Sequence, residues 1–359
     1  MRILFCSDAL IVDGVTSFVF HLSVALKKGG HKVAVLGRWA GKGYQTRLRD
    51  HGVDVIQCLS PTVGNFWFDS KARFFKPDVI ITDSRRSFPL AARLKKVTGA
   101  KVLTFFLDEL VKTDRKGRDV ESLIRYSDAW LSAEPPLLEK LDKIPTPFPK
   151  FLFRRPLVGL IEPAPLNSRD PFRIFCLGRL SGYKSAGAWD ILRNAIFLKN
   201  EIPSLEIAFA GGGWRAMKFW CFAQRSNFMA GEKFLHVLGT QTDPQPWFDW
   251  STLVCAGSTS AVEAILANRP LINFSARWLG FVTPEKVEEG FATYFAERSK
   301  NTLVRENPGL VIKEILRIYN TWDSAWMGEN VVNVREMVEP HFHGDDVGEN
   351  LESILKNLE

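Results

Sequence analysis

Two cationic side chains follow an apolar run in the second half of the chain and could bind a diphosphate. The run RIFCL, residues 173–177, leads into GRLSGYK, which contains Arg179 and Lys184. A buried strand that opens into a loop places the loop residues at the edge where α/β sheets bind ligands. A guanidinium matches two phosphate oxygens, and an ammonium adds a mobile charge. Both residues are therefore candidates for neutralising a diphosphate; two surface cations on an ordinary loop are the alternative.

A turn of small residues opens a helix further along the chain. The segment CAGSTSAVEAILANRPLI, residues 255–272, predicts a helix start at Ser258, Thr259 and Ser260, with Thr259 or Ser260 as the N-cap. The unpaired N–H groups and the positive dipole end of such a helix suit a phosphate. Glu263 lies at capping-box spacing from Ser260. It either caps the helix or binds the hydroxyl groups of a ribose.

The elements that carry these residues alternate between strands and helices, which predicts an α/β fold with two doubly wound sheets. A Pro-rich passage predicts a domain boundary near residue 165. The expected domains are 1–165 and 166–325, followed by a tail, 326–359, whose terminal helix could pack on the first domain. The expected strands are residues 2–10, 32–39, 53–59, 78–84, 101–107, 129–133, 173–180, 205–213, 234–239, 252–258 and 270–275, and the clearest expected helices are 15–30, 87–99, 187–200 and 259–269.

Composition narrows the class of protein. A chain of 359 residues fits two domains, and no apolar run reaches the roughly 20 residues that span a bilayer. The five cysteines are scattered without a C-x-x-C pair, so we expect reduced thiols, a cytoplasmic protein and no zinc site. The absence of a D-x-D pair gives no support for a bound metal. Most of the eleven tryptophans are expected in the core, while a minority could meet sugars or a membrane.

Charge is unevenly distributed. Residues 1–165 carry 27 Lys and Arg against 17 Asp and Glu, whereas residues 166–359 carry 20 against 23. A basic first half suggests an anionic partner such as nucleic acid, acidic lipid or a phosphorylated acceptor. No nucleic-acid recognition motif accompanies the charge, so specific nucleic-acid binding is not expected. Peripheral contact with anionic lipid at the inner face of the membrane, and simple solubility charge, are both left open.

Several motifs together resemble a known family. In chain order RIFCLGRLSGYK, FAGGG, HVLG and GSTSAVEAILANRPLI resemble the donor-binding half of the family-4 glycosyltransferases, and GHKVAVL resembles part of that family's opening. The resemblance implies the GT-B fold, in which two Rossmann-like domains face a central cleft. It also implies sugar transfer from a UDP-, GDP- or ADP-linked donor to a glycan, lipid-linked or small-molecule acceptor. The same resemblance implies retention of anomeric configuration. Because the sequence has no D-x-D pair, we also expect transfer without a metal, and no cofactor beyond the donor.

The resemblance assigns roles residue by residue. In the second domain Arg179 and Lys184 would grip the donor diphosphate with the helix start at Ser258–Ser260, and Glu263 would hold the ribose. The backbone around Gly239 and Thr240 would line the base pocket. In the first domain, which would bind the acceptor, Gly14 would let its loop approach the phosphate and sugar.

Three departures from the family pattern leave alternatives open. Many members carry two glutamates separated by seven residues, and Cys255 stands where the first would be. Asp13 precedes Gly14 where paired glycines are common, and Asp108 and Glu109 replace a frequent histidine. Asp108 or Asp13 would be the general base if the reaction inverts. A nucleotide-sugar epimerase and a catalytically degenerate GT-B binding or partner subunit are the alternative functions.

Overall fold

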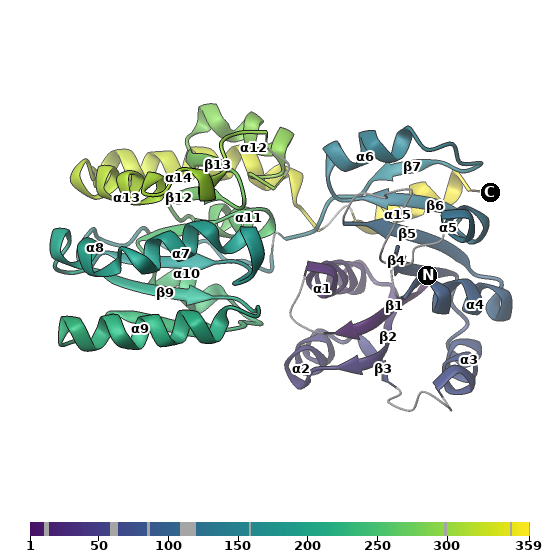
Figure 1. Ribbon diagram of the computed structural model, residues 1–359. Coiled ribbons are helices and arrows are strands. Elements are labelled where there is room, and N and C mark those ends of the chain that lie inside the picture. Colours follow the sequence, from purple (N-terminus) through teal and green to yellow (C-terminus); the bar gives the residue numbers. More distant parts are fainter. Residues whose placement is uncertain are drawn as a thin grey trace. The chain divides into compact units, whose positions relative to one another are not determined.

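The chain forms two compact units (Figure 1). Unit 1 comprises Met1–Leu157 and Phe342–Glu359, and unit 2 comprises Val158–His341. Residues 158–165 and 326–341 thus group with unit 2, whereas the sequence pattern places the domain bounds at 165 and 326. The computed structural model describes residues 1–10, 14–57, 64–84, 87–107, 120–157, 159–297, 300–344 and 347–358.

Unit 1 is built on a seven-stranded sheet with the order β3-β2-β1-β4-β5-β6-β7. Every neighbouring pair is parallel, and the strands are apolar because helices cover both faces. The chain order reverses between β1 and β4, which makes this the topological switch point of the sheet. The strands are β1 Arg2–Leu10, β2 Lys32–Ala40, β3 Asp54–Gln57, β4 Val79–Asp83, β5 Lys101–Phe106, β6 Ala129–Ser132 and β7 Lys150–Leu152.

Seven helices are described in unit 1, and the chain's last helix returns to this unit, where α15 packs against α1. Large rings fill the core beside the sheet; the Phe106 and Trp130 ring centroids lie 4.9 Å apart. The helices are α1 Gly14–Lys28, α2 Lys42–Asp50, α3 Gly64–Phe75, α4 Phe88–Thr98, α5 Val120–Tyr126, α6 Pro135–Asp142 and α15 Val347–Lys356.

Unit 2 contains a six-stranded sheet with the order β10-β9-β8-β11-β12-β13. The strands are parallel except for β13, which runs antiparallel to β12 at the edge. The order reverses between β8 and β11, so this sheet too has a switch point at its centre. The strands are β8 Arg173–Leu177, β9 Glu206–Ala210, β10 Leu235–Gly239, β11 Leu253–Ala256, β12 Leu271–Phe274 and β13 Trp278–Phe281.

The helices of unit 2 follow the predicted alternation, with one break. The predicted helix 187–200 is two helices, since Asn194 leaves helical geometry and its side chain donates to the Asp190 carbonyl oxygen at 2.9 Å. The helices are α7 Ala186–Arg193, α8 Ala195–Glu201, α9 Ala216–Ala230, α10 Gln245–Trp250, α11 Thr259–Leu266, α12 Val287–Thr293, α13 Leu310–Asn320 and α14 Ser324–Val338, with 3₁₀ turns η1 Gly182–Ser185, η2 Pro284–Lys286, η3 Val304–Glu306 and η4 Glu339–His341.

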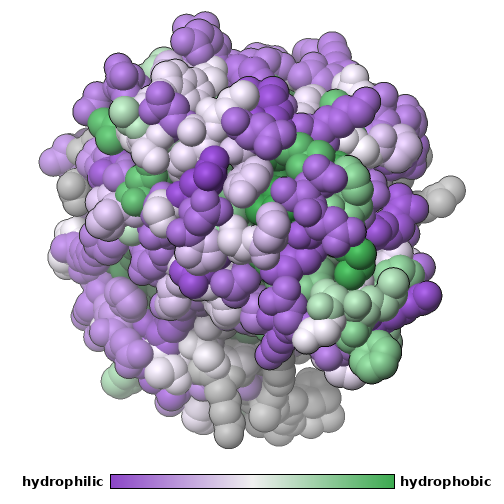
Figure 2. Space-filling model, turned by 90° about the vertical axis from the view of Figure 1, so that its left-hand side faces the viewer, coloured by the Kyte–Doolittle hydropathy of each residue, from purple (hydrophilic) through white to green (hydrophobic). Residues whose placement is uncertain are grey.

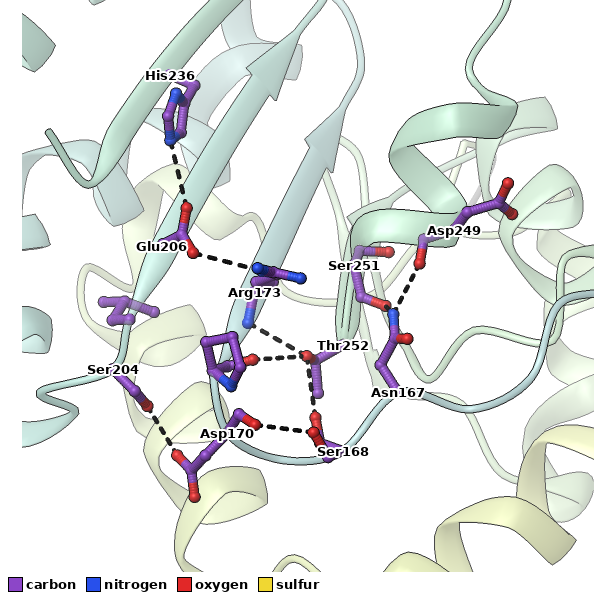
Figure 3. Close-up of polar contacts among 12 residues, drawn as sticks. Asn167, Ser168, Asp170, Arg173, Ser204, Glu206, His236, Asp249, Ser251 and Thr252 are labelled. Atoms are coloured by element: carbon purple, nitrogen blue, oxygen red, sulfur yellow. Dashed lines mark hydrogen bonds and ion pairs between the residues drawn. The ribbon is translucent and has the colours of Figure 1, made fainter.

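A network of polar side chains connects the strands at the amino-terminal edge of this second sheet (Figure 3). The Thr252 hydroxyl accepts the Arg173 N–H at 3.3 Å, and the Arg173 guanidinium reaches the Glu206 carboxylate at 3.3 Å. His236 Nε2 lies 3.6 Å from the same carboxylate, and burial lowers the pKa of this histidine. These side chains tie the starts of β8, β9, β10 and β11 together, so they serve the fold.

The tryptophans divide between core and surface. Trp189, Trp278 and Trp322 are half-buried against the core of unit 2. Trp130 is fully buried, but Trp67, Trp214, Trp220 and Trp326 are exposed. The count of aromatic residues predicts core volume, but it does not predict which helix faces remain uncovered.

Candidate active site

The candidate residues of unit 2 meet at the carboxyl-terminal edge of its sheet, at the β8–β11 switch point. The paired strands end together, with Leu177 opposite Ala256, so the loops that start at Gly178 and Gly257 begin side by side. Ligands of α/β sheets bind at this edge where the strand order reverses. The sequence-predicted motifs around residues 178–184 and 257–263 therefore lie on neighbouring strands.

Backbone hydrogen bonds hold the loop after β8 against the loop after β9. Leu180 N donates to Gly212 O at 2.9 Å, and Arg215 N donates to Leu180 O at 3.2 Å. Arg179, directly before Leu180, is exposed, and its guanidinium has no hydrogen-bond or ion-pair partner within the described part of the chain. A fixed backbone with an unengaged guanidinium is suited to an incoming anion.

Three successive glycines allow the loops to approach this closely. A Cβ on Gly211 would overlap the Gly178 carbonyl oxygen, and one on Gly212 would lie 2.7 Å from the Thr240 methyl group. Gly211 N also donates to Gly239 O at 2.8 Å, which adds the end of β10 to the same edge. The GGG sequence lacks the dinucleotide-binding spacing, and its role here is close packing of backbone.

Lys184 lies in the short turn η1 and is already engaged. Its ammonium forms an ion pair with the Glu297 carboxylate, whose second oxygen accepts the Ser275 hydroxyl at 3.1 Å. The Lys184 and Glu297 side chains are only 29% and 16% exposed, so solvent screens this pair weakly. A ligand phosphate would have to share Lys184 with Glu297 or displace it.

The helix after β11 begins at Thr259, and its N-cap lies one residue before the first predicted candidate. Ser258 is the N-cap, with φ 59° and ψ −137°, and its side chain makes no capping hydrogen bond. The prediction of Thr259 or Ser260 as N-cap is wrong, because the hydroxyl run offers three candidates and the turn after Gly257 selects the first. Glu263 is consequently too far into the helix for a capping box with Ser260. It is buried on α11.

A left-handed turn that the sequence analysis missed supports this helix start. Tyr294, Phe295 and Ala296 have φ of 48°, 48° and 68°, a region that non-glycine residues rarely adopt. The Phe295 carbonyl oxygen accepts Ser258 N at 2.8 Å and Asn273 Nδ2 at 3.2 Å.

The same turn brings two side chains to the site. The Tyr294 hydroxyl lies 3.1 Å from Thr259 Oγ1, and Glu297 follows directly to meet Lys184. Backbone strain of this kind is maintained by the surrounding structure and concentrates at functional sites. No glycine or proline marks the turn in the sequence, so no local signal could have found it.

In unit 1 the described candidate is Gly14, which follows β1, one of the two strands at the β1–β4 switch point. Gly14 is the first residue of α1, and its carbonyl oxygen accepts the buried Arg155 guanidinium at 3.3 Å. No atom of the described residues lies within 4 Å of a Cβ built on Gly14, so the structure described here does not itself demand glycine. Asp13, Asp108 and Glu109 lie outside the described residues.

His21 and most of the cysteines have the surroundings of structural residues. His21 is buried on α1, and burial together with the Arg155 and Arg47 charges lowers the pKa of its imidazole well below the ordinary value. Cys6, Cys176 and Cys255 are buried free thiols, and Cys221 is an exposed one.

The described ranges contain neither a cluster of metal-binding side chains nor a membrane-spanning helix. No group of three or more His, Cys, Asp or Glu side chains there could hold a metal ion. Among the same residues no helix combines the length and the apolar character needed to cross a bilayer.

Comparison of the structure with known proteins identifies the fold as GT-B, the fold that the motifs predicted. HepE from Anabaena, solved in complex with UDP, superimposes with a TM-score of 0.68 at 14% identity over 99% of this chain and 100% of that one. Sucrose-phosphate synthase from Thermosynechococcus elongatus gives 0.69 at 14% identity over 99% and 98%, and TarM gives 0.68 at 11% over 99% and 98%. By sequence, no family model and no curated protein matches.

Proposed function

We propose that this GT-B protein is a glycosyltransferase that moves a sugar, such as a hexose, from a nucleotide-diphosphate-sugar donor to an acceptor. The main support for this proposal is that the exposed Arg179, the half-buried Lys184 and the start of α11 come together at the β8–β11 switch point. Structures of HepE contain UDP and UDP-glucose, which supports a donor of this class, with a UDP-, GDP- or ADP-linked sugar as the candidates.

Unit 2 is proposed to bind the donor. Arg179, Lys184 and the first N–H groups of α11 stabilise the charge that develops on the diphosphate as the sugar leaves. Gly239 and Thr240, at the end of β10, line the pocket for the base of the donor nucleotide. Glu263 is assigned to the ribose by the family resemblance.

The site residues point to charge stabilisation as the main catalytic contribution. Preorganised cations and backbone N–H groups act without a metal, so we propose metal-independent transfer with no cofactor beyond the donor. Retention of configuration is part of the proposal, and Asp108 is kept as the base should the product be inverted. NMR of the product's anomeric proton distinguishes the two outcomes.

Unit 1 is proposed to bind the acceptor, which is a glycan, a lipid-linked sugar or a small molecule. The excess of cations in residues 1–165 suits an anionic acceptor or contact with anionic lipid. The free thiols Cys6, Cys176 and Cys255 suit a cytoplasmic location.

The test compares matched arginine substitutions in the donor unit. Arg179→Ala is expected to lower turnover by roughly 100- to 1000-fold, as loss of one preorganised donor does elsewhere. Arg305→Ala removes an exposed guanidinium from η3 and is expected to leave turnover unchanged. A screen of UDP, GDP and ADP by thermal shift identifies the base, because a ligand bound only by the folded state raises its melting temperature. Equal rates for wild-type protein and Arg179→Ala would refute the assignment.

A second candidate function is supported by one residue. Cys255, in place of the first glutamate of the family pair, is buried at the end of β11 and cannot supply a carboxylate. A GT-B binding or partner subunit that has lost catalysis would bind the nucleotide sugar tightly without transferring or hydrolysing it. Transfer of the sugar to any acceptor excludes both this function and an epimerase.

A further inference from the structure

Helix α9 is firmly attached to unit 2 along one side. Phe219 and Ala223 are buried in the core, and Asn227 is buried beside them. The Asn227 amide donates to Leu235 O at 2.9 Å and accepts the Phe234 and Leu235 N–H groups at 3.1 and 2.9 Å. The inner face of this helix is therefore fully used by the fold.

The outer face of the same helix is apolar and uncovered. Phe228 is 88% exposed, Met217 70% and Trp214, just before the helix, 74%. The exposed apolar positions 217, 221 and 228 recur at helical spacing on one side of α9, with the exposed Gln224 and Arg225 between the last two. Trp220 and Met229 widen this apolar surface. Figure 2 looks onto unit 2 and shows hydrophobic groups interrupting an otherwise hydrophilic surface.

Cations accompany these apolar residues and acidic residues do not. Residues 207–231 contain Arg215, Lys218 and Arg225 but no Asp or Glu, although residues 166–359 as a whole carry more acidic than basic side chains. The Arg215 guanidinium lies 4.7 Å from the centre of the Trp214 ring. The local charge is therefore positive against the trend of its own half of the chain.

We propose that this surface, the α9 face formed by Trp214, Met217, Trp220, Phe228 and Met229 with its three cations, is a docking site for an anionic lipid bilayer. Aromatic and Met side chains enter the boundary between headgroups and acyl chains, while Lys and Arg bind the anionic headgroups. A symmetric contact between two copies would instead bring like charges together. This surface is separate from the basic residues 1–165 and does not depend on the proposed transferase activity.

Vesicle flotation of the full chain tests the proposal. Wild-type protein should bind vesicles of phosphatidylcholine with about 30% phosphatidylglycerol and bind far less to phosphatidylcholine alone, as an electrostatic contribution requires. The double variant Met217→Gln, Phe228→Gln should lower the partition coefficient by at least about tenfold, because two exposed apolar side chains no longer enter the bilayer. Lys218→Gln with Arg225→Gln should lower it by about fivefold per charge.

The control removes two less exposed apolar side chains, Val332 (45% exposed) and Met337 (42% exposed), from another helix of unit 2. Val332→Thr with Met337→Gln on α14 should leave vesicle binding unchanged, and circular dichroism should show each variant folded. Failure of the wild-type protein to bind anionic vesicles overturns the proposal, as does an equal loss in the control variant. Light scattering that shows a dimer abolished by Phe228→Gln, without vesicle binding, would reassign the α9 face to self-association.

Discussion

The ion pair between Lys184 and Glu297 predicts that a carboxylate opposes diphosphate binding at the proposed donor site. Glu297 follows the left-handed turn at Tyr294–Ala296, and its carboxylate lies against the Lys184 ammonium and the Ser275 hydroxyl. A bound diphosphate would compete with this carboxylate for the same ammonium and would be repelled by its charge. Replacing Glu297 with Gln removes the charge and keeps the shape, so nucleotide binding should become tighter.

The size of the effect follows from Coulomb's law. Two like charges about 6 Å apart repel by about 3 kcal/mol at an effective dielectric constant of about 20. Solvent screening and the retained dipole of the glutamine reduce this to about 1.4 kcal/mol, which is about a tenfold change in Kd. Lys184→Met should act in the opposite direction and weaken binding.

Isothermal titration calorimetry with UDP, GDP or ADP, whichever binds, measures both changes. In the Lys184→Met background the Glu297→Gln substitution should give less tightening than in the wild-type background, because the competition for the ammonium is gone. This coupling is read from a double-mutant cycle. Weaker nucleotide binding by Glu297→Gln would refute the competition and would mean that the carboxylate positions Lys184 for the donor.

Three further outcomes are expected. Gly257→Ala places a Cβ 2.9 Å from the Phe274 carbonyl carbon and should cost about 2 kcal/mol of unfolding free energy, measured by urea denaturation. Gly328→Ala on α14 meets no atom of the described residues within 4 Å and should not destabilise. His21 has its pKa held well below 6.5 in the folded state, so below that pH the unfolded chain binds more protons. Stability should therefore fall by about 1 kcal/mol between about pH 7 and pH 5.5, and His21→Phe should flatten this slope in thermal melts. Transfer measured in EDTA should stay within about twofold of the untreated rate; abolition that added Mg²⁺ or Mn²⁺ reverses would contradict metal independence.

The strand pattern of both units could be read from the sequence for a physical reason. Parallel strands covered on both faces are continuous apolar runs, so segments such as RIFCL and LVCA stand out against their polar flanks. The convergence of the candidate site residues of unit 2 could be predicted from the same pattern, since residues after such strands collect at one edge of the sheet.

Other features depend on contacts between distant residues and could not be predicted. Glu297 lies 113 positions from Lys184, and nothing near either residue indicates the pairing. The left-handed turn at residues 294–296 is maintained by hydrogen bonds to Ser258 and Asn273 rather than by its own residue types. The amino-acid composition of α9 likewise could not show that one of its faces is uncovered. An apolar face has the same sequence pattern whether or not another element packs on it.

Unit 2 is inserted into unit 1 between two neighbouring residues, so it could be removed without breaking unit 1 elsewhere. Leu157 N donates to Phe342 O at 2.9 Å, so the two residues that flank the whole of Val158–His341 are hydrogen-bonded neighbours. Unit 2 is thus an insertion whose removal leaves a gap that a short glycine linker can bridge. A protein made of 1–157 and 342–359 should keep the seven-stranded sheet with α15 in place, and 158–341 expressed alone would report whether nucleotide recognition needs any other part of the chain.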